Sequence, residues 1–170
     1  MLHLNFIRKI INLGPLILLY YLSVSEIDSH FENYFEILSF NIQLIIIYFW
    51  VSKRPEALGS GHIFIAGLIN DVVIGFPLGL SSLSYLIVSF VANYVKHMTV
   101  NTRITTDWFT FFIAIFFSNL TLFILLSKFS RIGVSVTEMS YNTFFTLLFF
   151  PFFWFLFTYY NSIITSGKNA

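Results

Sequence analysis

Long runs of apolar residues occupy most of this 170-residue chain and leave little choice of fold. Hydrophobic residues make up 57% of the chain and charged residues only 10%, whereas soluble domains carry about 25% charged residues. None of the segments between the apolar runs is long enough to bury a core of its own. The sequence therefore predicts an all-α integral membrane protein with one polytopic domain over residues 1–170.

Six apolar segments are candidates for transmembrane helices, because a helix needs about 20 mostly apolar residues to cross a bilayer. Their approximate bounds are Ile10–Val24, Ile37–Val51, Ile63–Ile74, Leu80–Val95, Trp108–Leu126 and Phe144–Tyr160. The third is short, and a Gly-Phe-Pro-Leu-Gly segment separates it from the fourth. Proline interrupts a helix and glycine permits tight turning, so we expect a helical hairpin here. The alternative is one kinked helix, which leaves five spans.

The basic residues orient the predicted spans. With six spans and a cytoplasmic N-terminus, the inner segments hold Arg8, Lys9, Lys53, Arg54, Lys96, Arg103 and Lys168, and the outer segments hold Lys128 and Arg131. Such an excess on the inner side follows the positive-inside rule. A five-span arrangement moves Lys96 and Arg103 outside and weakens the bias. The charges therefore favour six spans with both termini in the cytoplasm.

Several function classes lack their sequence signatures. The chain has no cysteine, which excludes disulfides and thiol chemistry, and its net charge of +1 gives no reason to propose nucleic acid as a partner. No nucleophile elbow, paired-histidine helix or phosphate-binding loop occurs. The four histidines do not form a ligand pair at helical spacing. We expect no enzyme, no metal and no cofactor.

One acidic residue, Asp71, lies within the apolar segment Phe64–Gly79. An ionised carboxylate at the centre of a bilayer costs about 2.5–3.5 kcal/mol, so such residues face a partner, a cavity or a ligand. The polar side chains available in other spans are Asn93, Ser118, Asn119 and Thr121. A proton pathway needs several ionisable groups in series, and Asp71 stands alone. A structural or partner-docking role is therefore favoured over a ligand or proton role.

Gly67, Asp71 and Gly75 recur at a spacing of four residues, which places them on one face of a helix. Small residues let membrane helices approach closely. We therefore expect this face, with Pro77 and Gly79 of the following turn, to form a packing site for the transmembrane helix of a partner. The spacing leaves open whether the contact lies within the chain or with another protein.

The loop before the third segment is the second informative region. Lys53 and Arg54 are expected to meet anionic lipid headgroups. Pro55 and the small residues 59–61 indicate a structured turn. Trp154, in the last segment, is expected in a belt of aromatic residues at the same face of the membrane.

A basic loop with a proline and a glycine, followed by F-x-x-G-L-x-x-D-x-x-x-G-x-P-L-G, resembles the rod shape-determining protein MreD family. The matching residues here are Pro55, Gly61, Phe64, Gly67, Leu68, Asp71, Gly75, Pro77, Leu78 and Gly79. The strong resemblance covers about residues 53–83. The rest of the chain agrees in its pattern of apolar segments.

The resemblance implies a non-enzymatic protein of the bacterial inner membrane that acts in cell elongation. It implies association with an MreC-like protein, and a link between MreB filaments inside and peptidoglycan synthesis by a RodA-like glycosyltransferase and an elongation transpeptidase. The family is also similar in span layout to the substrate-binding subunits of energy-coupling-factor vitamin transporters. A transporter subunit that binds a small molecule or lipid is therefore the alternative. A lipid-modifying enzyme is a third possibility, but the acids and histidines it needs do not cluster in the sequence.

Overall fold

The computed structural model describes residues 2–25, 40–98, 103–129 and 136–166, and these ranges fold into α-helices with one short 3-10 helix. In chain order the elements are α1 (Leu2–Val24), α2 (Ile42–Lys53), η2 (Pro55–Ala57), α3 (Ser60–Ile74), α4 (Leu80–Met98), α5 (Ile104–Phe129) and α6 (Val136–Ser166). The described ranges contain no strand. The all-α prediction is therefore confirmed.

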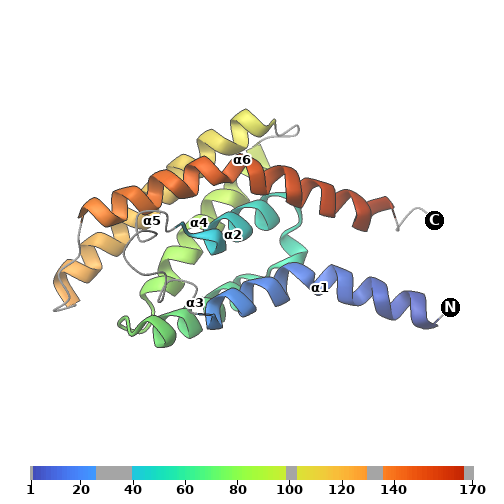
Figure 1. Ribbon diagram of the computed structural model, residues 1–170, viewed down its shortest axis with the longest axis horizontal. Coiled ribbons are helices and arrows are strands. Elements are labelled where there is room, and N and C mark those ends of the chain that lie inside the picture. The colour runs from blue at the N-terminus through green and yellow to red at the C-terminus, as the bar shows by residue number, and fades with distance from the viewer. Residues whose placement is uncertain (1, 26–39, 99–102, 130–135, 167–170) are drawn as a thin grey trace, which may run out of the picture.

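Successive helices alternate in direction (Figure 1). The start of α1, the end of α2, the end of α4, the start of α5 and the end of α6 all lie toward one end of the molecule. The first turns of α1 and the last turns of α6 extend beyond the connection between α2 and α3. Helices α4 and α5 cross the others obliquely, so the bundle is not a set of parallel rods.

Helix α2 forms the centre of the molecule. Its side chains from Leu44 to Ser52 are all buried, as expected for a helix that is apolar all round. It packs against α1, α4 and α6. Beside it, the rings of Phe111 in α5 and Phe150 in α6 stack with centroids 4.4 Å apart, and the Tyr48 ring meets both edge-on. Aromatic packing thus joins three helices around one core.

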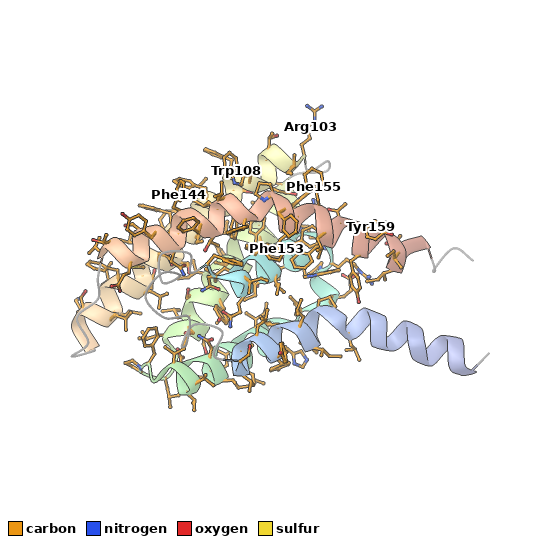
Figure 2. The ribbon with its side chains drawn as sticks, viewed as in Figure 1. Arg103, Trp108, Phe144, Phe153, Phe155 and Tyr159 are labelled. Carbon is orange, nitrogen blue, oxygen red and sulfur yellow. The ribbon has the colours of Figure 1, made fainter. Side chains whose placement is uncertain are left out.

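The outer surface is strongly apolar. Large hydrophobic side chains point outward from α5 and α6, and Figure 2 shows Phe144, Phe155 and Tyr159 among them. Among the described helices, Ile104–Lys128 and Val136–Thr165 are long and apolar enough to cross a membrane by themselves. The 12 residues of α2 and the 15 of α3 reach about 18 and 22 Å at 1.5 Å per residue, which is less than the about 30 Å of a hydrocarbon core. Of the six predicted spans, two are thus clearly long and apolar enough to cross a membrane, and the others are shorter or less apolar, including the third, which was expected to be short.

The observed ends refine the predicted ones. Helix α3 ends at Ile74 and α4 begins at Leu80, as the glycines and the proline between them indicated. Helix α2 begins only at Ile42, and α5 and α6 extend past both of their predicted ends. The predicted start of the second segment at Ile37 lies outside the described residues, as do Arg131 and Lys168.

Candidate functional site

The connection between α3 and α4 has a backbone that only glycine adopts readily. Gly75 follows the last residue of α3 with φ 78°, and Gly79 has φ 99°. The N–H groups of Gly75 and Phe76 both donate to the carbonyl oxygen of Asp71. A left-handed glycine with this bonding ends helices very commonly. The two glycines of the sequence motif therefore stop α3 and turn the chain back.

Asp71 lies at the point where α3 meets the start of α4, and its side chain is fully buried. Its Oδ2 accepts from the N–H of Gly79 at 2.7 Å, and its Oδ1 accepts from the N–H of Ser81 at 2.8 Å. The first N–H groups of a helix have no partner within the helix. A carboxylate there is also attracted by the positive end of the helix dipole. Asp71 therefore caps α4 from within α3.

The backbones of α3 and α4 approach closely next to this cap. A Cβ atom added to Gly67 would lie 2.4 Å from the Cα of Ser82. The hydroxyl of Ser82 donates to the carbonyl of Phe64 at 2.9 Å, and the amide of Asn70 donates to the hydroxyl of Ser81 at 3.0 Å. Gly67 is thus small because α4 occupies the space that a side chain would need.

These contacts bear on two expectations about the face of Gly67, Asp71 and Gly75. Asp71 is anchored to a neighbouring helix, but through backbone N–H groups at the start of α4 and not through the polar side chains available in other spans. Ser118 instead pairs with Ser84, and Asn119 donates to Thr143 at 2.6 Å. Gly75 lies past the end of α3, so it does not continue the face of Gly67 and Asp71.

A second buried carboxylate, Asp107, lies in the first turn of α5 with 1% of its side chain exposed. Its Oδ2 accepts from Lys53 Nζ at 2.8 Å and from the indole Nε1 of Trp154 at 2.9 Å. Lys53 also lies 5.8 Å from the centre of the Trp154 ring, within range of a cation–π contact. The cluster of Lys53, Asp107 and Trp154 therefore joins the end of α2, the start of α5 and the middle of α6.

Asp107 retains one unsatisfied oxygen, since its buried Oδ1 has no hydrogen-bond partner among the described residues. One turn further along α5, the Thr110 hydroxyl pairs with the hydroxyl of Tyr48 and also donates to the carbonyl of Thr106 at 2.8 Å. The hydroxyl pair of Tyr48 and Thr110 thus adds a second polar contact between α2 and α5, next to the ion pair of Lys53 and Asp107.

Sequence reasoning missed Asp107 and assigned its partners elsewhere. Lys53 was expected to face lipid headgroups, but it is mostly buried and binds a carboxylate, so that expectation is wrong. Trp154 was expected in an aromatic belt, but its N–H is used inside the molecule. An available signal was that Lys53 and Asp107, of opposite charge, end two predicted spans on the same side of the membrane.

The short connection between α2 and α3 is polar and structured. Pro55 is the first residue of η2, where its missing N–H is harmless. Arg54 Nε donates to Glu56 Oε1 at 3.3 Å. A hydrogen bond from the Glu56 backbone, and after it the Arg54 side chain, lowers the pKa of this exposed carboxyl. The Glu56 carboxyl is therefore ionised at neutral pH.

Two hollows on the described surface are open, mostly apolar grooves. One lies between α5 and α6, has a volume of about 180 Å³ and is lined by Trp108, Phe109, Phe112 and Leu147. The other has a volume of about 350 Å³ and is lined by residues 77–80 of the α3–α4 turn and by Leu125 of α5. No group of three histidine or acidic residues that could hold a metal ion occurs in the described ranges.

The fold and its buried carboxylates define a class of protein: an apolar protein whose described residues form helices, with two buried carboxylates that join one helix to another. Comparison with protein families matches residues 8–160 of the chain to the family described as rod shape-determining protein MreD. The chain belongs to this membrane-associated family of shape-determining proteins, which confirms the resemblance seen in its sequence. Curated proteins and solved structures give no significant match.

Proposed function

We propose that the protein is a non-catalytic, multi-pass component of the bacterial inner membrane that acts in the cell-elongation complex and links cytoskeletal filaments to peptidoglycan synthesis. The family match over residues 8–160 carries this proposal. The two buried carboxylates agree with it, because one caps a helix and the other forms an ion pair, which are structural uses of charge.

The proposed orientation places the basic end of the molecule in the cytoplasm. The α2, α4 and α5 termini that lie at this end (Figure 1) carry Lys53, Lys96 and Arg103. The described cation at the opposite end of α5 is Lys128. By the positive-inside rule, the start of α1 and the end of α6 then lie inside, and the α3–α4 turn faces outward.

The proposed partners are an MreC-like protein, a RodA-like glycosyltransferase and an elongation transpeptidase, with an indirect link to MreB filaments. The contact site we propose differs from the face expected at first. Gly67 and Asp71 are in contact with α4 and are therefore not available to a partner. The turn that they hold in place leaves 71% of Leu78 exposed beside an apolar groove. The transmembrane helix of a partner would therefore contact residues 77–79, and Gly67, Asp71 and Gly75 would shape that surface from within.

This site is tested by changing Leu78→Gln and measuring recovery of the MreC-like partner from detergent extracts, together with cell shape. Replacing an exposed contact residue leaves the fold intact, so recovery should fall about tenfold, the effect of a hot spot worth about 1.4 kcal/mol. The matched control is Leu148→Gln, which alters another exposed leucine, on α6, and should change neither readout. Normal recovery and rod shape for Leu78→Gln would remove the turn from the interface.

The transporter alternative gains no support from a specific observation. Ligand sites are concave and bury most of their ligand around a few well-placed polar groups, whereas both grooves described above are open and mostly apolar. Both oxygens of Asp71 are already bound by backbone N–H groups, which leaves no free carboxylate oxygen there for a ligand or a proton pathway.

A further inference from the structure

The start of α5 carries an arginine outside the polar network described above. Arg103 immediately precedes the helix and is exposed, and Figure 2 shows its side chain pointing away from the ribbon at the same edge of the molecule as Trp108. Within the described ranges, it forms no ion pair. The nearest acid along the helix, Asp107, is buried and already paired with Lys53, so the guanidinium charge of Arg103 is not neutralised from that side.

An apolar groove lies farther along α5, and its first lining residue, Trp108, comes five positions after Arg103. Its walls are Trp108, Phe109 and Phe112 of α5 and Leu147 of α6. The indole N–H of Trp108 donates to the carbonyl of Leu147 at 3.0 Å, which ties the two helices across the seam. About half or more of each aromatic side chain in the wall is exposed. The groove is therefore preformed and presents its aromatic lining to the surroundings.

The order of these features along α5 matches the order of groups in a phospholipid. At 1.5 Å per residue, Trp108 lies about 7.5 Å and Phe112 about 13.5 Å along the axis from Arg103. In the proposed orientation Arg103 lies at the membrane surface, and the apolar groove follows about one and a half to two and a half turns deeper. Lys53 at this end is paired with Asp107, but Lys96 lies at the same end as Arg103, so the positive charge of Arg103 and Lys96 favours an anionic ligand.

We propose that this site binds one anionic glycerophospholipid, with its phosphate at Arg103 and one acyl chain in the groove between α5 and α6. The inference goes beyond the proposed function: it needs the chain to lie in a membrane but does not need the elongation complex. An anionic headgroup near a basic residue is favoured electrostatically over a zwitterionic one, while the groove accepts the acyl chain of either lipid.

Fluorescence of the purified full chain in vesicles tests the site, because brominated acyl chains quench a nearby indole. Vesicles of phosphatidylcholine would carry brominated phosphatidylglycerol in one series and brominated phosphatidylcholine in the other. Trp50 is buried and Trp154 is partly buried, so the exposed Trp108 should dominate, and Trp108→Phe defines the background. Phosphatidylglycerol should quench at about fivefold lower content, since one basic residue at an anionic surface is worth about 1 kcal/mol.

Two variants separate the headgroup from the groove. Arg103→Gln should abolish the roughly fivefold preference, and the matched control Lys128→Gln, which removes a charge at the other end of α5, should retain it. Leu147→Phe fills the groove and should reduce quenching by both lipids, with an unchanged circular dichroism spectrum as the check on folding.

Three results would overturn the proposal. The first is an equal response of the wild-type protein to both lipids, and the second is an unchanged preference in Arg103→Gln. The third is loss of the preference when inorganic phosphate is added at constant ionic strength, which would assign Arg103 to a free anion. Because the measurement uses purified protein and vesicles, its failure is distinguishable from a failure of the proposed role in cell elongation.

Discussion

At the scale of single residues, the molecule shows two ways to bury a carboxylate in apolar surroundings. Burying a charge is costly unless it is paired and hydrogen-bonded. Asp71 uses two backbone N–H groups at the start of the next helix, whereas Asp107 uses an ammonium and an indole N–H from two other helices. Each carboxylate therefore stabilises a specific helix contact, and the two make separate predictions.

Removing the Asp71 carboxylate should destabilise the fold. In Asp71→Leu the N–H groups of Gly79 and Ser81 lose their acceptor, and each unsatisfied buried group costs about 1–3 kcal/mol. We expect a loss of about 3 kcal/mol, and a smaller loss for Asp71→Asn, which keeps one oxygen acceptor. Unfolding in mixed detergent micelles measures both. Asn93→Ala, at an exposed site on α4, should change the free energy by less than about 0.5 kcal/mol. Equal stability of Asp71→Leu and the wild type would refute the capping role.

The Lys53–Asp107 pair should show strong coupling in a double-mutant cycle. Lys53→Met leaves a buried carboxylate without its cation, and breaking a buried pair costs about 3–5 kcal/mol. The double variant Lys53→Met, Asp107→Leu should be destabilised by less than the sum of the single changes, because neither charge remains. Free energies of unfolding for the four proteins give the coupling energy, expected to exceed about 1 kcal/mol. Additive effects would show that the ion pair contributes nothing specific.

At the scale of helices, α3 and α4 form one packed unit. Their contact depends on a missing side chain at Gly67, on hydroxyl and amide bonds along the seam, and on the cap at Asp71. Two glycines of α3 allow a controlled test of this packing, because they lie in the same helix and only Gly67 is crowded by another helix.

Gly67→Ala should weaken the α3–α4 contact, and Gly61→Ala should not. The added methyl group at Gly67 would overlap the backbone of Ser82, whereas nothing lies within 4 Å at Gly61. Overpacking costs about 1–3 kcal/mol, while alanine at an open helical position stabilises by about 0.4–1 kcal/mol through the unfolded chain. Thermal unfolding of the purified variants should therefore shift in opposite directions. A shift of the same sign and size in both would contradict the close contact.

The ends of these helices could be predicted from the sequence, but the partners of Asp71 could not. Glycine and proline between two apolar runs determine where α3 stops and α4 starts, because these residues act locally. The cost of a buried carboxylate is also evident from sequence, but the atoms that offset it depend on how the chain folds back. The atoms that offset the cost of Asp71 are backbone N–H groups eight and ten residues later. A search for polar side chains in the sequence does not find them, because every residue except proline has such a group.

At the scale of the whole molecule, alternating helices and an uneven distribution of charge predict one topology. Reporter fusions that are active on only one side of the membrane should place both ends of the chain in the cytoplasm. A reporter inserted after Ala57 should also be cytoplasmic, and one inserted after Leu78 should be external. This orientation follows from the positive-inside rule, because basic residues lie at the shared end of α2, α4 and α5. Opposite locations for the two ends would contradict six crossings.

The central position of α2 was harder to foresee than the apolar character of the chain. A run such as Ile45–Ile47 fits a lipid-facing helix as well as a core helix, and composition does not separate the two. The structure shows that this helix is covered on all sides, whereas the phenylalanines of α5 and α6 face outward. Asp107 was overlooked for a related reason: it stands at the edge of an apolar run, where charged residues normally meet water.

The cap at Asp71 also bears on how the protein is made. The first N–H groups of α4 obtain their acceptor only when α3 lies beside them, and the carboxylate in α3 loses its cost only when α4 has turned back. Each helix alone would therefore place unsatisfied polar groups in the bilayer. Biosynthesis should deliver the two into the bilayer together, as a single hairpin, with Gly75–Gly79 as the leading edge.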